Sequence, residues 1–525
     1  MCGIFVCARR IQGDPQTFKT TDSSFEELCI GLKHANTSRG PDAQRSHKVS
    51  FGTPTSDAST LNLEFFASEL CLRGSLPVVQ PHIRNGDILC WNGEIFEGLD
   101  MGPVENDGVR LFESSKDLKS PAQIRDLFSS VEGPYAFVFH HESGSLIFGR
   151  DPLGRRSLLI HKPSPSHPYL ILTSVTSGAN AGYSFEELST DHIFYLNLKD
   201  LAQLDDPMAL EDHLKALTRC PSQPTVSSYV MNPSIPPDTW PRLVSHDEIP
   251  DYLPGFHRSV MLRVHNIPHR SHCVSRSQVC FCDPVFRHIP PEESIDLLNV
   301  AFENPRKIRM ETEGNLGGPE GESVRVSYMV PDRKTGLQEV EELRQLCPGR
   351  TWNFIEIDVP YHESKEARSV VEALMLPSRT VMDFSLALAL YFASRGVGHV
   401  QPVAYTSPAR VLLNGLGSDE LLGGYGRHRS AFNSWRELQL EIQRIPVRNL
   451  GRDDRICSSH GKETRHPFLS FGVVSFLANL PVQHKMDPRL EAGLGDKIGR
   501  KKRAMQFGSH SARMEGDAKG DVTLD

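Results

Sequence analysis

The sequence has little of what marks secreted, membrane-spanning or nucleic-acid-binding proteins. It contains 11 cysteines in 525 residues, far fewer than a disulfide scaffold uses. No run approaches the ~20 apolar residues that a membrane span requires, so we expect no membrane insertion. Positive charge is not in excess, because 57 Lys and Arg against 65 Asp and Glu leave a net charge of −8. This balance argues against nucleic acid or an anionic membrane as a partner.

The first ten residues contain no basic leader before their short apolar run, since Arg9 and Arg10 follow it. Together with the low cysteine content, this predicts a cytoplasmic protein with free thiols. The length exceeds what one hydrophobic core serves and predicts two or three domains. The divisions we expect are residues 1–200, a proline-rich connector at 201–264, a further domain at 265–510 and a polar tail at 511–525.

Residues 1–200 show short β-like runs separated by turn residues, which predicts antiparallel sheets packed face to face. A helix is expected over residues 24–34, with Ser23 and Glu26 forming a capping box. Glu142-Ser-Gly144 predicts a hairpin. The expected strands are 65–72, 88–91, 135–139, 145–148, 158–161, 169–175 and 193–198.

Residues 265–510 alternate between apolar runs and helical stretches, which predicts an α/β domain with a doubly wound parallel sheet. The connector before it holds eight prolines between residues 221 and 254 and is expected to be loop-like with some helix. The expected strands are 278–282, 295–302, 352–357 and 411–413, and the expected helices are 336–347, 362–374 and 380–394.

Cys2 is a candidate nucleophile because it becomes the first residue if Met1 is removed. Its α-amino group, with an ordinary pKa of about 7.7–8.0, could then deprotonate its own thiol without a histidine partner. The alternative is a buried cysteine that acts only as a small apolar side chain.

Charged and amide residues that follow Cys2 favour a site for an amino acid. Such a site needs a cation for the substrate carboxylate, an anion for the ammonium and two donors for an oxyanion. The sequence offers these groups in Arg39-Gly-Pro-Asp42, Arg73, Trp91-Asn-Gly-Glu94 and Asn106-Asp107.

These motifs, with Met1-Cys-Gly-Ile4 and Gly149-Arg-Asp-Pro-Leu-Gly154, resemble the N-terminal-nucleophile (class II) glutamine amidotransferase domain. The resemblance implies an α+β sandwich of stacked antiparallel sheets with flanking helices. It implies that Cys2 attacks the glutamine amide, that Asn92 and the Gly93 N–H form the oxyanion hole, and that Arg73 and Asp107 hold the carboxylate and the ammonium. The other implied glutamine-binding residues are Glu94, Arg39 and Asp42. For Asp42 and Arg150, a salt-bridged turn is the alternative.

The second half carries an apolar run, a glycine turn and two carboxylates in Val411-Leu-Leu-Asn-Gly-Leu-Gly-Ser-Asp-Glu420. This pattern places Asp419 and Glu420 beyond the carboxyl end of a strand, where α/β folds bind ligands. They could hold Mg²⁺ or an amino-acid substrate. The alternative is an ordinary helix start, since acidic residues favour that end of the helix dipole.

Further motifs follow in order: Arg452-Asp-Asp-Arg455, His460-Gly-Lys-Glu463, Arg465-His-Pro-Phe-Leu469 and Lys502-Arg503. The set resembles the synthetase domain of glutamine-hydrolysing asparagine synthetases, closest to the branch of asparagine synthetase domain-containing proteins. The resemblance implies ATP-dependent amidation of aspartate, with ATP and Mg²⁺ as cofactors and a homodimer as a possible assembly. The implied nucleotide-binding residues are Val300, Asn414, Gly415, Lys502 and Arg503, and Asp419 and Glu420 would bind aspartate or Mg²⁺.

The chain departs from that family at several places, one of which is the segment between Leu494 and Arg503, which looks shortened. The Ser-Gly-Gly-x-Asp-Ser loop, whose backbone N–H groups cradle the pyrophosphate, is missing after the expected strand 278–282. About a dozen residues then separate this strand from residue 295, too few for a full crossover. Leu416 replaces an acidic residue of the family, and Ser470 stands where an Asp usually follows Pro-Phe-Leu.

Two explanations of the missing loop stay open, a gene-model or splice artefact and a real loss of synthetase chemistry. The leading functional hypothesis is a glutamine-dependent asparagine synthetase. The alternative is a catalytically reduced relative that binds or regulates, with residual glutaminase activity. A zinc site is not expected, because the spacing of Cys273, Cys280, Cys282 and His288 fits no common zinc signature.

Overall fold

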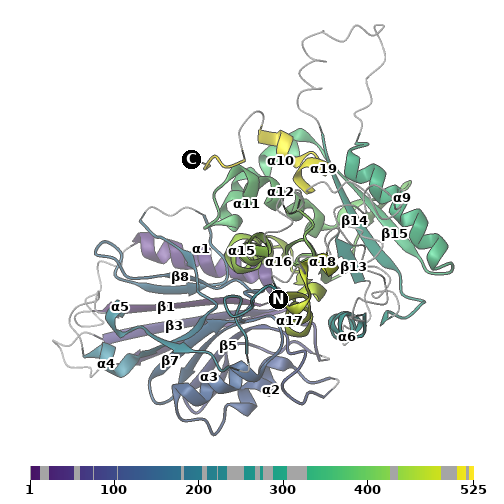
Figure 1. The fold of residues 1–525 in the computed structure, drawn as a ribbon. Helices are drawn as coiled ribbons and strands as arrows, with labels where there is room; N and C mark the ends of the chain where they lie inside the picture. The colour runs from purple at the N-terminus through teal and green to yellow at the C-terminus, as the bar shows by residue number, and fades with distance from the viewer. Residues whose placement is uncertain are drawn as a thin grey trace. The chain divides into compact units, whose positions relative to one another are not determined.

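We describe the protein from a computed structural model, which divides the chain into two compact units (Figure 1). The first unit consists mainly of Met1–Val230 and Gln439–Glu463, and the second of Met231–His265, His269–Leu438 and Thr464–Asp525. The described residues are 2–11, 23–51, 60–74, 76–102, 104–178, 182–203, 210–221, 223–232, 253–265, 272–275, 288–303, 328–425, 428, 435–485, 505–515 and 520–524.

The first unit contains two six-stranded sheets, with strand orders β10-β8-β9-β1-β3-β2 and β12-β11-β7-β6-β5-β4. Neighbouring strands in both sheets are antiparallel. The strands are β1 Gly3–Ile11, β2 Ala43–Phe51, β3 Thr60–Glu69, β4 His82–Arg84, β5 Asp87–Gly93, β6 Tyr135–His141, β7 Ser145–Arg150, β8 Leu159–His161, β9 Leu170–Thr173, β10 Glu186–Glu187, β11 His192–Asn197 and β12 Lys215–Thr218. The helices are α1 Ser23–Arg39, α2 Asp107–Ser114, α3 Pro121–Ser130, α4 Leu198–Ala202 and α5 Leu210–His213.

Three apolar clusters show how these elements are layered. The first cluster joins the inner faces of both sheets, through residues such as Val6 and Val138. A second lies between α1 and the β1 sheet, with Phe25 among its members, and a third lies under α2 and α3, with Phe128 among them. Because successive side chains of a strand point to opposite faces, each sheet is covered on both sides. Figure 1 shows the resulting order: α1, two sheets, then α2 and α3.

This sandwich confirms the α+β architecture expected for the N-terminal half. The predicted helix at 24–34 is α1, which continues to Arg39, and the predicted hairpin is β6–β7 with Gly144 at φ +93°. Two segments of the predicted connector are packed rather than loop-like. β12 pairs with β11, and α6 (Leu253–Val264) buries Phe256 and Val260 in the second unit.

Residues 439–463 also belong to the first unit. They include the end of α15 (Trp435–Ile445), the π-helical turn Pro446–Leu450, α16 (Gly451–Ser458) and the first residue of β19 (Glu463–Arg465). The N-terminal fold is therefore completed by a segment more than 200 residues downstream.

The second unit is built on a seven-stranded sheet with the order β17-β16-β15-β14-β13-β18-β19. Strands β15, β14, β13 and β18 are parallel, and β16 and β17 add an antiparallel edge that the sequence did not suggest. The strands are β13 His272–Ser275, β14 Ile295–Phe302, β15 Trp352–Val359, β16 Val397–Val400, β17 Val403–Thr406 and β18 Val411–Asn414. The helices are α9 Pro331–Leu346, α10 Tyr361–Glu366, α11 Arg368–Met375, α12 Val381–Arg395, α13 Ser418–Leu422, α17 Phe471–Asn479, α18 Val482–Lys485 and α19 Met505–Gly508, with 3-10 turns at Pro467–Leu469 and Ser511–Glu515.

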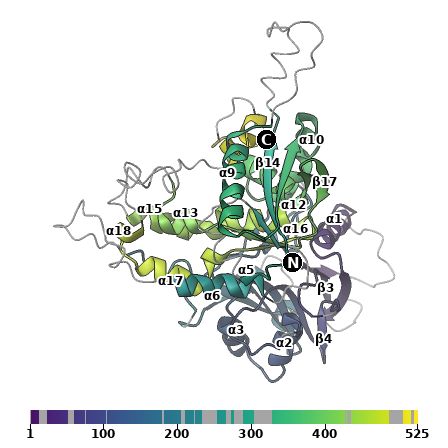
Figure 2. The same cartoon turned by 90° about the vertical axis from the view of Figure 1, so that its right-hand side faces the viewer.

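Helices cover both faces of the parallel strands. The Asn299 amide donates to the carbonyl of Asp332 at the start of α9, whereas Phe302 packs on Phe392 of α12. Asn299 and Phe302 are three residues apart on β14, so their side chains point to opposite faces. Figure 2 shows α9 alongside β14. The doubly wound arrangement predicted for this half is confirmed.

The first strand of this sheet differs from the prediction. Residues 278–282 lie outside the described residues, and the strand next to β14 is β13, which ends at Ser275. Residues 276–294 therefore separate β13 from β14, rather than the dozen expected, which is a length that a parallel connection permits. The predicted connection was too short because the predicted strand, 278–282, begins after β13 has ended. The sequence 276–294 still contains no Ser-Gly-Gly-x-Asp-Ser.

No helix in the described part of the chain combines the length and apolar character needed to cross a bilayer. Within the same residues, no group of three or more His, Cys, Asp or Glu side chains is arranged to hold a metal ion. Cys280 and Cys282 lie outside the described residues.

Candidate active site

Cys2 directly precedes β1 and is held through its backbone on both sides. Its N–H donates to Asn92 Oδ1 at 3.0 Å, and its carbonyl accepts from Arg39 Nε at 3.2 Å. The next N–H, of Gly3, donates to Ser68 Oγ at 3.0 Å. Glycine is required at position 3, since a Cβ there would lie 2.4 Å from the Asn36 carbonyl oxygen. The backbone around Cys2 is thus fixed by three different elements.

The Cys2 thiol is buried, and burial raises its pKa to about 11, with a further increase from the Glu69 carboxylate. A neutral thiol is a poor nucleophile, so the site needs a base close to the sulfur. The nitrogen that donates to Asn92 is the atom that becomes the α-amine if Met1 is removed. Gln80 Nε2 lies 3.6 Å from Sγ, and Gln80 Oε1 accepts from the Trp91 N–H at 2.9 Å. Sequence reasoning missed Gln80, because no local pattern connects it to residue 2.

Asn92 and Gly93 lie at the end of β5, beside Cys2. Asn92 is fully buried, and its Nδ2 has no hydrogen-bond partner among the described residues, although its Oδ1 is engaged by Cys2. A buried donor without a partner is costly, and a developing oxyanion would satisfy it. Gly93 has no room for a side chain, since a Cβ would lie 2.7 Å from the Pro134 carbonyl oxygen. The pair expected to form the oxyanion hole therefore lies next to the predicted nucleophile.

Arg73, Glu94 and Asp107 form a buried charged cluster in the same unit. Arg73 Nε lies 3.5 Å from Glu94 Oε2 and 4.0 Å from Asp107 Oδ1. Asp107 Oδ2 accepts the Ile95 N–H at 2.7 Å, at the start of α2. Burial and the neighbouring Glu94 raise the pKa of Asp107 to about 8, against the opposing effect of Arg73. One cation and two carboxyls placed together suit the head group of an α-amino acid.

Arg39 and Asp42 have positions that differ from the pocket-lining role expected for them. The Arg39 guanidinium is fully buried beneath the Cys2 carbonyl. Asp42 Oδ2 accepts the Cys71 N–H at 2.8 Å and so fixes the chain just before Arg73. Arg150 pairs with Glu187 and donates to the Gly154 carbonyl at 2.9 Å, which matches the alternative of a salt-bridged turn.

Glu69 is a further candidate that the sequence did not reveal. The register that pairs Gly3 with Ser68 places Glu69 opposite Cys2 across β1 and β3. Its Oε1 accepts from Asn106 Nδ2 at 3.2 Å, and its buried Oε2 has no partner among the described residues. Burial raises its pKa to about 7. Only the strand register brings this carboxyl to the nucleophile, so the spacing along the chain carries no signal for it.

The predicted site of the second unit lies where β13 and β18 run side by side. Ser275 pairs with Asn414 at the carboxyl ends of these strands. Strand numbers fall along the sheet from β17 to β13 and then rise from β18 to β19, so the order of the strands reverses between β13 and β18. Asn414 Oδ1 accepts the Leu416 N–H at 2.9 Å, and a Cβ at Gly415 would meet nothing within 4 Å. This position is the one at which α/β sheets bind ligands.

One of the two acidic residues there, Glu420, is engaged by the fold itself. Glu420 Oε2 accepts the Gly417 N–H at 3.0 Å at the start of α13, and its Oε1 accepts the Tyr425 hydroxyl at 2.6 Å. This is the helix-start arrangement weighed as the alternative. Val300 is a buried residue of β14, and Lys502 and Arg503 lie outside the described residues.

Mg·ATP does not fit the described residues of this second site. Both oxygens of Glu420 accept internal hydrogen bonds, Leu416 brings no carboxylate, and the chain has no glycine-rich phosphate loop after β13. We therefore derive no step through ATP from these residues.

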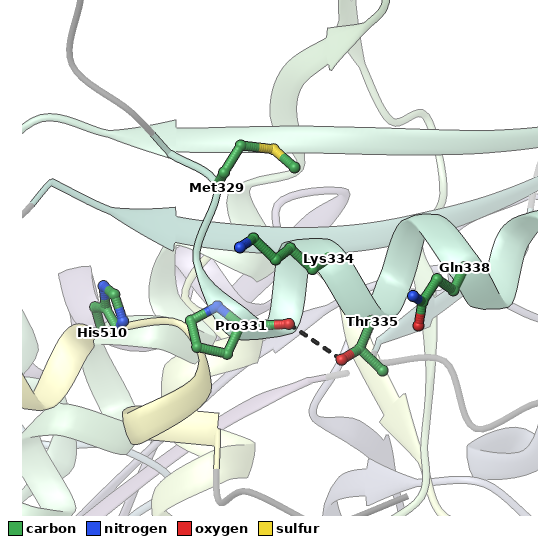
Figure 3. Close-up of a pocket in the computed structure, with 6 residues that line it drawn as sticks. All are labelled: Met329, Pro331, Lys334, Thr335, Gln338 and His510. Atoms are coloured by element: carbon green, nitrogen blue, oxygen red, sulfur yellow. Dashed lines mark hydrogen bonds between the residues drawn. The ribbon is translucent and has the colours of Figure 1, made fainter. Parts of the chain in front are cut away.

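A pocket of about 380 Å³ lies at the start of α9 (Figure 3). Lys334, Thr335 and Gln338 line it from α9, together with Met329, Pro331 and His510, and the Thr335 hydroxyl donates to the Pro331 carbonyl at 3.1 Å. None of the site residues predicted from the sequence lines this pocket.

Known proteins are similar to a segment of the second half of the chain and to nearly the whole chain. The family model described as asparagine synthase matches residues 435–503. Asparagine synthetase domain-containing protein 1 of Gallus gallus is 32% identical, covering 91% of this chain and 93% of the relative, and that of Homo sapiens is 30% identical, covering 93% and 92%. A putative asparagine synthetase (glutamine-hydrolyzing) 1 of Methanocaldococcus jannaschii is 31% identical over 20% of this chain and 19% of the relative. Because the similarity extends over nearly the whole of both chains, this protein belongs to the family of asparagine synthetase domain-containing protein 1.

Proposed function

We propose that the first unit hydrolyses the side-chain amide of glutamine at Cys2. The observation that carries the proposal is the pairing of Cys2 N with Asn92 Oδ1, which leaves the buried Asn92 Nδ2 beside the nucleophile. The cluster of Arg73, Glu94 and Asp107 supplies the charges that bind an amino-acid head group. A free amino group is also required at Cys2, so the active form lacks Met1.

In this reaction the α-amine of Cys2 takes the thiol proton, and the thiolate attacks the amide carbon. The carbonyl oxygen becomes an oxyanion that accepts from Asn92 Nδ2 and the Gly93 N–H. When the C–N bond breaks, the proton returns from the α-ammonium to the leaving amine, and ammonia departs. Water then hydrolyses the thioester, which releases glutamate and restores the thiol.

The decisive experiment is ammonia release from glutamine by the wild-type chain and by Cys2→Ala. We expect the substitution to abolish release, because it removes the thiol that forms the proposed thioester. Cys220→Ala is the matched control, since it removes a partly exposed thiol of the same unit that donates to Asp126 instead. Ammonia release at the wild-type rate from Cys2→Ala would refute the assignment.

For the ammonia, the resemblance of the second half to glutamine-hydrolysing asparagine synthetases favours amidation of aspartate to asparagine with ATP and Mg²⁺, against the poor fit of Mg·ATP to the described residues. The similarity to a putative asparagine synthetase of Methanocaldococcus jannaschii supports the same reaction. Cytoplasmic location and a homodimer stay predictions from the sequence.

A second candidate is a family member that keeps the glutaminase step and has lost the synthetase step. The absence of a phosphate loop in residues 276–294, Leu416 in place of a carboxylate and the engaged oxygens of Glu420 favour it. Titration calorimetry with Mg·ATP separates the two candidates. Tight binding by the purified full chain would exclude the reduced protein, and no binding at millimolar nucleotide would exclude the complete synthetase.

A further inference from the structure

Helix α16 is buried along its entire length, although four of its eight residues are charged. Arg452, Asp453, Asp454 and Arg455 are each less than a tenth exposed. Buried charges need partners, because taking an unpaired ion out of water costs several kcal/mol. Arg452 pairs with its neighbour Asp453, but the partners of Asp454 and Arg455 come from the N-terminal 200 residues.

Asp454 pairs with Arg39, the residue that holds the Cys2 carbonyl. Arg39 Nη2 donates to Asp454 Oδ2 at 2.8 Å, and Arg39 Nη1 donates to Ser458 Oγ at 2.5 Å, one turn further along α16. Asp454 Oδ2 also accepts the Ser157 N–H at 3.1 Å, and its Oδ1 lies 3.6 Å from Arg156. Burial opposes ionisation of Asp454, but Arg39 and Arg156 outweigh it and hold the pKa of the carboxyl below its ordinary value.

From this chain of contacts we infer that Asp454 is a positioning residue for the nucleophile. It fixes the Arg39 guanidinium, and Arg39 fixes the Cys2 carbonyl, while Asn92 and Ser68 hold the backbone on either side. The inference rests on the proposed glutaminase function and assigns helix α16 to the support of its nucleophile. Asp454 lies within the segment that matches the asparagine synthase family model. The glutaminase site is thus incomplete without residues from the synthase-like half of the sequence.

The physical reason is that a guanidinium can hold a carbonyl in place only if it is held itself. Without Asp454, Arg39 would keep its charge in a buried place with Ser458 as a neutral partner, and its position would relax. A displacement of the nucleophile by about 1 Å is enough to lower a rate by about 100-fold. Substrate contacts are not altered, because Arg73, Glu94 and Asp107 are separate from this chain of contacts.

The same helix offers a matched control. Arg455 pairs with Glu187 and donates to Ser157 Oγ at 2.8 Å, so it also joins α16 to the N-terminal sheets through a buried ion pair. Its hydrogen bonds run to Glu187 and to the Ser157 hydroxyl, whereas Asp454 bonds Arg39 directly. Arg455→Met and Asp454→Asn therefore each break a buried ion pair of α16. The first pair is with Glu187 of β10, and the second is with Arg39 of α1, which holds the Cys2 carbonyl.

The test compares full-length Asp454→Asn, Asp454→Glu, Ser458→Ala and Arg455→Met. For Asp454→Asn we expect kcat for glutamine hydrolysis to fall about 100-fold per folded molecule, with KM changed less than threefold. Asp454→Glu should recover part of the loss, since it restores the charge. Ser458→Ala leaves the ion pair between Arg39 and Asp454 intact and should lower kcat about fivefold. It is the milder change, so it tests the same contact if Asp454→Asn does not fold. Arg455→Met should lower the melting temperature as much as Asp454→Asn and leave kcat unchanged.

A second readout keeps this inference separate from the proposed function. The rate at which iodoacetamide alkylates Cys2, followed by peptide mapping, reports the position and ionisation of the thiol whether or not glutamine is a substrate. We expect its pH profile to shift in Asp454→Asn and Ser458→Ala and to stay unchanged in Arg455→Met. If Asp454→Asn lowers only the melting temperature and leaves kcat and the alkylation profile as in wild type, the positioning role is wrong. If neither the wild-type chain nor any variant hydrolyses glutamine but alkylation shifts as expected, the glutaminase proposal fails and the positioning role stands.

Discussion

The two predicted sites of this chain differ in what their polar residues do. Around Cys2, the fold leaves functional groups over: the buried Nδ2 of Asn92 has no partner among the described residues, and Asp107 is crowded by a second carboxyl. Around Asn414, the fold uses its own groups, since both oxygens of Glu420 accept hydrogen bonds from the turn and from Tyr425. Unsatisfied buried groups store free energy that a ligand can release, whereas satisfied ones hold a turn in shape. The comparison therefore supports the proposed chemistry at the first site and a structural role for Glu420 at the second.

The largest expected effect follows from removing the Nδ2 donor of Asn92. In Asn92→Ala we expect kcat for glutamine hydrolysis to fall about 100- to 1,000-fold, the usual cost of losing one oxyanion-hole donor. KM should change little, because the amino-acid head group binds elsewhere. Steady-state kinetics with Asn62→Ala as control checks this, since Asn62 lies on β3, where its Oδ1 accepts from Ser50 Oγ. If kcat of Asn92→Ala stays within threefold of wild type, Asn92 does not stabilise an oxyanion, and this difference between the two sites is wrong.

The next effect concerns one glycine from each site. A Cβ at Gly93 would lie 2.7 Å from both Pro134 O and Tyr135 Cβ, whereas one at Gly415 would meet nothing within 4 Å. We expect Gly93→Ala to lower the free energy of unfolding by about 1–3 kcal/mol, the cost of overpacking, and Gly415→Ala to change it by about 0.5 kcal/mol or less. Urea denaturation measures both. Equal losses in the two variants would show that the sites are equally constrained.

The smallest effect is a pH dependence of glutamine binding. Because the pKa of Asp107 is raised to about 8, its carboxyl is protonated at pH 7 and must lose the proton to receive an ammonium. The sign follows: affinity should increase with pH up to about 8, by at most tenfold per pH unit. Calorimetry on Cys2→Ala, which separates binding from chemistry, should show proton release that disappears in Asp107→Asn. Glu69, with its pKa raised to about 7, would add a separate inflection that Asp107→Asn leaves in place.

Most of the fold could be predicted from local pattern. Strand β14 has the predicted bounds 295–302, and α1, β5, β7 and α12 lie within a few residues of theirs. These elements alternate or repeat with a period that the sequence displays. The strand β13 was missed because four residues carry too little pattern, and the antiparallel edge β16–β17 because its residues are largely exposed.

The residues of the candidate site likewise fall into those that the sequence revealed and those that only the structure revealed. Cys2, Asn92, Gly93, Arg73 and Asp107 belong to short motifs that can be recognised in order along the chain. Gln80 and Glu69 belong to none, since the first reaches Sγ from a loop and the second through the register of β1 with β3. Contacts of this kind depend on which strands pair, and that is not written in any local window.

By itself, the sequence indicated the fold classes of the two halves through its strand and helix patterns, and the amidotransferase motifs through their resemblance to a known family. Only the tertiary structure decided that Glu420 is bonded to its own turn, that Glu69 faces Cys2, and that α16 supplies the carboxylate for Arg39. The reason is physical. A buried charge must be neutralised by whichever residue the packing brings near, and for Arg39 that residue is Asp454, more than 400 positions along the chain.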